Sequence, residues 1–141
     1  MLATPSAYLS PQALEQAFYD AISRADLDAL MALWVKQDDI VCIHPGAARL
    51  VGAHAIRASF AEIFEQGELK VRARQLHAVE HVGFAVHNVV EEVSRDEEMP
   101  QDVYLLATNV YINTVQGWRI QLHHVSITPG SAPDTRAHLL H

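Results

Sequence analysis

The residues best suited to chemistry gather in the stretch 103–126, VYLLATNVYINTVQGWRIQLHHVS. Two apolar runs flank a polar break at 113–117, a pattern typical of an antiparallel hairpin. If the turn has an even number of residues, one face carries Asn109, Tyr111, Trp118, Ile120, Leu122 and His124, and the other carries Thr108, Val110, Ile112, Gln121 and His123. Asn109 and His124 are therefore predicted to meet, either on an oxygen atom of a ligand or in an internal polar network without a ligand.

The nine histidines do not have the spacing of a metal site. None lies in a helical HxxxH pair or beside a pair of cysteines. His123 and His124 are adjacent in a predicted strand and face opposite ways, so they are poor partners for one metal ion. We predict no metal and no other cofactor.

Nucleophilic catalysis is also not indicated. Cys42 lies inside an apolar run and is predicted to be a small buried hydrophobe. Ser126 has no acid and histidine companions in a triad order. Glu91 and Glu92 alternate faces of a predicted strand, so at most one points inward, and we treat that one as a secondary pocket candidate.

Three helices are predicted before residue 67, each with an apolar stripe. Ser10 and Pro11 give the first an N-cap and an initial proline, and Asp26 caps the second. The third runs over about 53–66. The stripes are Leu14, Phe18, Ala21 and Ile22, then Leu27, Leu30, Met31 and Trp34, then Ile56, Phe60, Ile63 and Phe64.

Strands are predicted over 40–44, 69–80 and 84–94, followed by the hairpin. An acidic connection covers 95–100. This order favours an α+β fold in which three N-terminal helices pack on a curved antiparallel sheet. We predict one domain over residues 10–128, with an N-terminal arm over 1–9 and a flexible tail over 129–141.

Parts of the sheet are apolar on both faces. Residues 84–90 and 103–106 are apolar at odd and even positions, as expected when both faces are covered. The helices suffice for one face only, so we predict a homodimer formed sheet to sheet.

Composition narrows the class of partner. The net charge of −7 argues against nucleic acid or an anionic membrane surface. No stretch of the 141 residues is apolar enough for a membrane span or a signal peptide. The single cysteine excludes an internal disulfide and suits a reducing compartment, so we predict a cytoplasmic location.

Four stretches together resemble the nuclear transport factor 2-like superfamily, in its SnoaL-like or ketosteroid isomerase-like branch. They are ADLDALMALW (25–34), DDIVCIHPG (38–46), LVGAHAIRASF (50–60) and TNVYINTVQGWRIQLHHVS (108–126). The resemblance spans about residues 8–128 and implies a cone-shaped fold whose ligand lies between the helices and the concave sheet face. Isomerases, cyclases, dehydratases, hydrolases, transport factors and kinase association domains share this fold.

The resemblance also implies roles for single residues. Where ketosteroid isomerase-like proteins carry an Asp-Pro pair with the acid or base, this sequence has His44 followed by proline, and histidine can do the same proton transfer. The strand residue that donates to a developing oxyanion falls on Asn109. The family's tyrosine on the first helix corresponds to Phe18, and Tyr19 is expected about 100° around the helix. Kinase association domains carry a cluster of basic pocket residues on the strand that Asn109 matches, and this sequence does not reproduce the cluster, so an anionic ligand is not specifically implied.

These observations predict a homodimer that binds a small apolar or weakly acidic molecule. If it is an enzyme, its chemistry would be cofactor-free isomerisation, cyclisation or dehydration by proton transfer next to a carbonyl. His44 would be the base, Asn109 the hydrogen-bond donor and His124 a supporting residue. The predicted apolar pocket consists of Phe18, Trp34, Ile56, Phe60, Phe64 and Tyr111. The alternative is a non-catalytic binding or self-association module.

Overall fold

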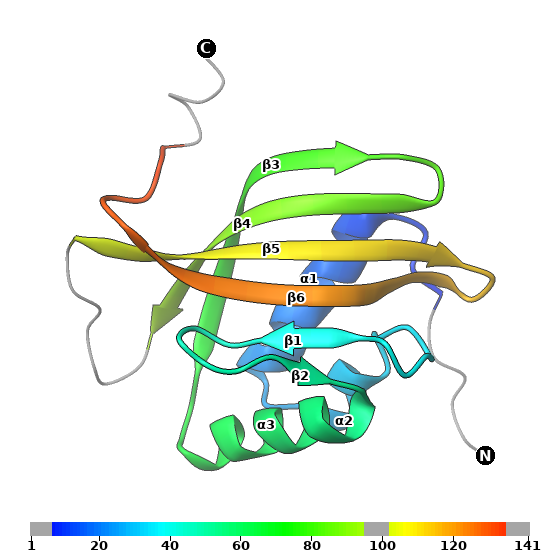
Figure 1. Ribbon diagram of the computed structural model, residues 1–141, viewed down its shortest axis with the longest axis horizontal. Helices are drawn as coiled ribbons and strands as arrows, with labels where there is room; N and C mark the ends of the chain where they lie inside the picture. The colour runs from blue at the N-terminus through cyan, green and yellow to red at the C-terminus, as the bar shows by residue number, and fades with distance from the viewer. Residues whose placement is uncertain (1–6, 95–101, 135–141) are drawn as a thin grey trace.

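The computed structural model describes residues 7–94 and 102–134, which form one curved sheet with helices on one face (Figure 1). Its long strands are β3 (Lys70–Glu80), β4 (Phe84–Ser94), β5 (Val103–Thr114) and β6 (Gly117–Pro129). Two short strands, β1 (Val41–Ile43) and β2 (Leu50–Val51), extend the sheet in the order β2-β1-β6-β5-β4-β3. The α+β class is confirmed.

The sheet differs from the prediction in two details. β1 pairs with β6 in parallel, so the sheet is mixed and not wholly antiparallel. β2, which pairs with β1, was not predicted from the sequence because it has only two residues. The connection predicted over 95–100 lies outside the described residues.

The helices are α1 (Pro11–Ser23), α2 (Leu27–Met31) and α3 (Ala53–Glu65). The predicted caps are confirmed: the Ser10 hydroxyl accepts a hydrogen bond from the amide of residue 13, and the Asp26 carboxylate accepts one from the amide of residue 29, both at 3.1 Å. α2 ends earlier than its apolar stripe because Trp34 forms an isolated parallel bridge with Ile120 of β6. α1 lies behind the long strands in Figure 1, and its buried residues include Leu14, Phe18 and Ile22.

The apolar core lies between these helices and the concave sheet face. Phe18 contacts both Trp34 and Phe60 edge to face, with ring centroids 6.3 Å apart in each pair. Such close packing fixes the height of α1 above the strands. The polar side chains of α1 are thereby held within hydrogen-bond distance of the sheet.

A β-bulge changes the register of the hairpin. Near the turn Tyr111 pairs with Ile120, but the next pair is Val110 with Leu122, so Gln121 is an extra residue. Beyond the bulge every side chain of β6 moves to the opposite face from that predicted. Asn109 therefore pairs with His123 and not with His124.

The N-terminal residues that the structure describes contact the hairpin turn. The amide of Trp118 donates to the carbonyl of Tyr8 at 2.9 Å, and the guanidinium of Arg119 lies 6.0 Å from the centre of the Tyr8 ring. Residues 1–6 of the predicted arm and 135–141 of the predicted tail lie outside the described residues. Within the described part of the chain, no helix has the length and apolar character needed to cross a membrane.

Candidate functional site

A buried polar network lies where α1 meets the concave face of the sheet. Glu91 from β4, Asn109 from β5 and His123 from β6 point to this face, and Tyr19 of α1 packs over them. The Tyr19 hydroxyl donates to Glu91 Oε2 at 2.7 Å and accepts from Asn109 Nδ2 at 3.1 Å. His123 Nδ1 lies 2.6 Å from Asn109 Oδ1, and His123 Nε2 lies 3.8 Å from Glu91 Oε2.

The hydrogen bonds of this network all run in one direction. An amide oxygen can only accept, so His123 Nδ1 carries a proton and donates it to Asn109. The Asn109 amide donates to Tyr19, and Tyr19 donates to Glu91. The chain of donors therefore ends on the carboxyl group of Glu91. In neutral His123 the lone pair is on Nε2, the ring atom that faces the same carboxyl group.

Burial shifts the pKa of each titratable residue in the network. Burial raises the pKa of Glu91 to about 7, although the hydrogen bond from Tyr19 lowers it in part. Burial and the nearby Glu91 charge raise the pKa of Tyr19. Burial, with smaller effects from His44 and His124, lowers the pKa of His123 to about 3. Near neutral pH the network thus holds a neutral histidine and a carboxyl group poised to gain or lose a proton.

A second polar cluster adjoins the first on the same sheet face. His87 of β4 is fully buried, with Nδ1 2.9 Å from Glu15 Oε1 and Nε2 3.0 Å from Glu80 Oε1. The hydroxyl of Tyr111 donates to Glu15 Oε1 at 2.7 Å, and Gln12 donates to Glu80. Burial alone would lower the pKa of His87, but the hydrogen bonds and charges of Glu15 and Glu80 raise it.

A cavity of about 520 Å³ between α1 and β3 reaches both clusters. The helix contributes five lining residues: Gln12, Glu15, Gln16, Tyr19 and Asp20. The strand contributes Val71, Arg72, Ala73 and Gln75. Glu15 belongs to the second cluster and Tyr19 to the first, and the two lie one helical turn apart. A molecule in this cavity would therefore contact a member of each network.

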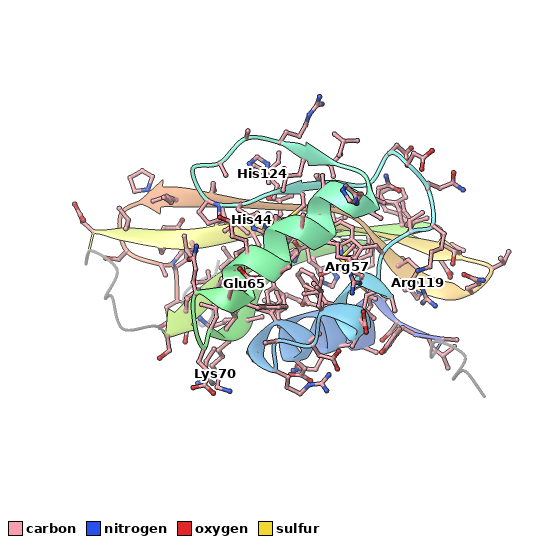
Figure 2. The ribbon with its side chains drawn as sticks, turned by 90° about the horizontal axis from the view of Figure 1, so that it is seen from below. His44, Arg57, Glu65, Lys70, Arg119 and His124 are labelled. Atoms are coloured by element: carbon pink, nitrogen blue, oxygen red, sulfur yellow. The ribbon has the colours of Figure 1, made fainter. Side chains whose placement is uncertain are left out.

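His44 lies apart from this cavity, between β1 and α3 (Figure 2). Its Nε2 is 2.9 Å from the hydroxyl of Ser59, and that hydroxyl donates to the carbonyl of residue 56. His44 Nε2 must therefore donate to Ser59, which leaves Nδ1 unprotonated in the neutral ring. Burial lowers the pKa of His44. Cys42, 3.7 Å away, has its pKa raised by burial to about 12, so it stays a thiol.

The predicted meeting of Asn109 and His124 is wrong. Because of the bulge, His124 is exposed on the convex face, whereas Asn109 is buried on the concave face. In Figure 2, His124 lies farther from α1 than His44 does. His123, which the unbulged register placed outside, occupies the inner position.

The residues predicted as an apolar pocket form the packed core. Five of them are at most 3% exposed: Phe18, Trp34, Ile56, Phe60 and Tyr111. Phe64 is half-buried and packs against this core. Most side chains around the α1–β3 cavity are instead polar, because the face of α1 beside the apolar stripe carries glutamine, glutamate and aspartate.

Tyr19, Glu15 and His87 were not identified as site residues from the sequence. The expected 100° between Phe18 and Tyr19 is compatible with both being buried, because α1 lies in a concave sheet that contacts a wide part of its surface. Alternation along β4 does place His87 and Glu91 on one face, so this signal was available. The position of the bulge could not be predicted from the pattern of residues in the sequence.

No group of three His, Cys, Asp or Glu side chains among residues 7–94 and 102–134 is arranged to hold a metal ion.

Comparison with known proteins gives a consistent family. The model of the SnoaL-like domain matches residues 12–129. A proposed calcium/calmodulin-dependent protein kinase type II association domain from Thiobacillus denitrificans is 36% identical, covers 86% of this chain and 97% of its own, and has a TM-score of 0.78. A proposed dehydratase of the NTF2-like family from Streptomyces avermitilis is 26% identical, with coverage of 84% and 92% and a TM-score of 0.72.

A more distant structure shares the fold alone. The ketosteroid isomerase-like protein from Erwinia carotovora atroseptica is 17% identical, with coverage of 82% and 92% and a TM-score of 0.65. No curated protein sequence matches the chain.

Proposed function

Because the chain belongs to the SnoaL-like domain family of the NTF2-like superfamily, we propose that it binds a small molecule in the α1–β3 cavity and catalyses cofactor-free proton transfer next to a carbonyl group. Isomerisation and dehydration are the reaction classes that such a transfer serves. The ligand we propose is polar, with oxygen atoms that the amides and carboxylates around the cavity can bind. The sequence-based expectation was a small apolar or weakly acidic molecule, and we now favour a polar one.

One observation carries the proposal: a carboxyl group with a pKa of about 7 is hydrogen-bonded to a tyrosine that lines the cavity. General acid–base catalysis works best when the pKa of the catalytic group lies near the operating pH. Structural carboxylates on a protein surface rarely have such a pKa, and strongly shifted values gather at functional sites.

The network suggests how a proton would move. When Glu91 is protonated, it can donate to the Tyr19 oxygen, and the tyrosine hydrogen is then free to turn to a ligand oxygen in the cavity. A carbonyl oxygen bonded in this way is polarised, which makes removal of a proton from the adjacent carbon easier. Asn109 holds the Tyr19 oxygen in place, and neutral His123 holds Asn109. Glu91 and Tyr19 are thus the acid side of the proposed site.

A ligand-detected experiment tests this proposal. Small ketones, hydroxy ketones, hydroxy acids and enones are incubated with the protein in D₂O, and proton NMR follows exchange of the hydrogens next to each carbonyl. We expect catalysed exchange for at least one class, reduced about 10²-fold or more in Glu91→Gln and Tyr19→Phe.

Two variants serve as controls. Glu92→Gln makes the same chemical change on the neighbouring residue, whose side chain is 49% exposed and faces Arg74, and it should leave exchange unchanged. His44→Gln separates this site from the base predicted by family resemblance. Exchange that survives Glu91→Gln but is lost in His44→Gln would contradict the proposal and support His44.

A second candidate function is self-association through the convex sheet face. An aliphatic row crosses all six strands there, because the register aligns Val79, Val86, Val110, Leu122, Val41 and Val51. Val79 and Val51 are 41% and 46% exposed, and α1 lies on the opposite face. The relative that is 36% identical is named as an association domain. We propose that two copies pack sheet to sheet across this row.

Sedimentation equilibrium tests the proposed homodimer. Val110 lies in the middle of the row, whereas Val115 is a fully exposed valine at the β5–β6 turn. We expect wild type and Val115→Lys to have twice the mass of the chain and Val110→Lys to be monomeric, since a buried unpaired ammonium opposes association. A monomeric wild type, or a dimeric Val110→Lys, would refute this interface.

A further inference from the structure

The Glu15–His87–Glu80 cluster connects the inside of the cavity with the outside of the protein. Glu15 lines the α1–β3 cavity, and its side chain is 10% exposed. His87 has no exposed surface, and the side chain of Glu80 is 39% exposed. The three groups are joined by contacts of 2.9 and 3.0 Å. An ionisable group is thus present at the cavity, in the interior and in solvent, with no gap longer than a hydrogen bond.

We propose that these three residues are a proton path, in which Glu15 exchanges a proton with the ligand and His87 and Glu80 pass it to and from bulk water. This inference rests on the proposed function only in naming a ligand as the donor or acceptor. Glu15 is one helical turn from Tyr19 on the same cavity wall, so it would be the base that faces the acid side formed by Tyr19 and Glu91. Two such groups can move a proton between two atoms of a ligand, with one group removing it and the other polarising the carbonyl oxygen.

Each step makes and breaks only O–H and N–H bonds once the ligand proton has been taken. Glu15 accepts a proton from the ligand and gives it to Nδ1 of neutral His87. The resulting imidazolium releases its Nε2 proton to Glu80, which exchanges it with water. The reverse order brings a proton from water to the ligand. No oxidant, reductant or other reactant is needed.

The surroundings of His87 suit both of its protonation states. Glu15 from α1 and Glu80 from β3 face its two ring nitrogens. The imidazolium donates to both carboxylates, whereas the neutral ring donates from one nitrogen and can accept from a protonated carboxyl group at the other. The ring of Tyr111 lies edge-on at 5.1 Å between centroids, and its hydroxyl donates to Glu15. Asn109 of β5 is the residue that pairs with His87 of β4. The two carboxylates raise the pKa of His87 against the effect of burial, so the imidazolium is accessible in a site that excludes water.

A purely structural ion cluster differs from a proton path in one measurable way. If the cluster only fixes α1 to the sheet, the ring protons of His87 are closed off and exchange with water only when this part of the fold opens. If the cluster is a path, these protons reach water through Glu80 without any opening. The lifetimes of the two ring N–H protons therefore separate the alternatives, and no ligand is needed.

The experiment uses the full-length protein with ¹⁵N-labelled histidine. The His87 ring signals are assigned by their loss in His87→Gln, and exchange with water is measured against the backbone amides of β4. We expect ring-proton exchange about tenfold or more slower in Glu80→Gln than in wild type, while exchange of those amides is the same in both proteins. Glutamine keeps an oxygen that accepts from His87 but cannot take up its proton. Glu92→Gln on the convex face should change nothing.

The outcomes are distinct. Ring-proton exchange that Glu80→Gln leaves unaltered, or slows only together with exchange of the β4 amides, would overturn the path and leave the acid side formed by Tyr19 and Glu91 intact. If no carbonyl compound shows catalysed hydrogen exchange in D₂O, but exchange of the His87 ring protons depends on Glu80, the proposed reaction is wrong and the proton path is still supported. A folded amide spectrum for Glu80→Gln ensures that the comparison is between native proteins.

Discussion

At the scale of single residues, the buried surroundings of Glu91 disfavour the charged form of its carboxyl group. Its side chain is 8% exposed, and burial raises its pKa to about 7 from an ordinary value of 4.5. In the unfolded chain the group ionises above its ordinary pKa, whereas the folded protein keeps it protonated up to the higher one. Glu91 therefore costs nothing in acid, and its cost to stability grows as pH rises toward 7.

This cost predicts the effect of removing the charge. Glu91→Gln should raise the free energy of unfolding at pH 8 by up to about 3 kcal/mol, because glutamine still accepts from Tyr19 but has no charge to desolvate. The gain should become small near pH 4, where Glu91 is largely protonated in both the folded and the unfolded wild-type protein. Urea unfolding at the two pH values measures it. Glu92→Gln, exposed and beside Arg74, should change stability by less than about 1 kcal/mol at either pH. Equal stability of wild type and Glu91→Gln at pH 8 would contradict this account.

Tyr19 lowers the pKa of Glu91 by donating to the ionised carboxylate. Tyr19→Phe removes this donor and should raise the pKa of Glu91 further, as measured by carbon NMR of the carboxyl group during a pH titration. Tyr104→Phe provides a matched loss of a hydroxyl on the convex side of β5 and should leave that pKa unaltered. A lower or unchanged pKa in Tyr19→Phe would mean that the hydrogen bond does not stabilise the charge.

At the scale of elements, the β5–β6 hairpin depends on its turn. Gly117 has φ +98°, and a Cβ at this position would lie 2.9 Å from the backbone N and O of Tyr8. Gly83, in the β3–β4 turn, has no atom within 4 Å of such a Cβ and no positive φ. Gly117→Ala should therefore lower the free energy of unfolding by about 2 kcal/mol or more, and Gly83→Ala by less than about 0.5 kcal/mol. Thermal unfolding of both variants is the measurement, and equal losses would contradict the described contact of Tyr8 with the turn.

The elements also determine what could be predicted from the sequence. α1 and α3 have caps or glycines and clear apolar stripes, and the long strands have clear alternation, so their positions were predicted closely. The extra residue Gln121 was not predictable, because a bulge changes pairing without changing composition. Because of that one residue, His123 occupies the site in place of the predicted His124. Site prediction was thus limited by strand register and not by the identification of elements.

At the scale of the whole molecule, the family resemblance predicted the fold well and the site less well. His44 and Asn109 lie on the concave side as the family pattern implies, but the α1–β3 cavity takes its contacts from Glu15 and Tyr19. The polar side chains of α1 meet β3 and β4 only in the folded protein, over separations of about 70 residues such as Tyr19 to Glu91. Local pattern alone contains no measure of such contacts. The predicted cytoplasmic location stays a prediction.

The pKa of Glu91 in the wild-type protein tests the central claim most directly. Carbon NMR of the labelled carboxyl groups, with Glu91 assigned by Glu91→Gln, follows its titration from pH 3 to pH 9. We predict a midpoint of about 7, which would give the protein a buried proton donor and acceptor at neutral pH. A midpoint near the ordinary value of 4.5 would contradict the account, because Glu91 would then be a fixed carboxylate at neutral pH and the Tyr19 hydroxyl hydrogen would stay bonded to it instead of turning to a ligand.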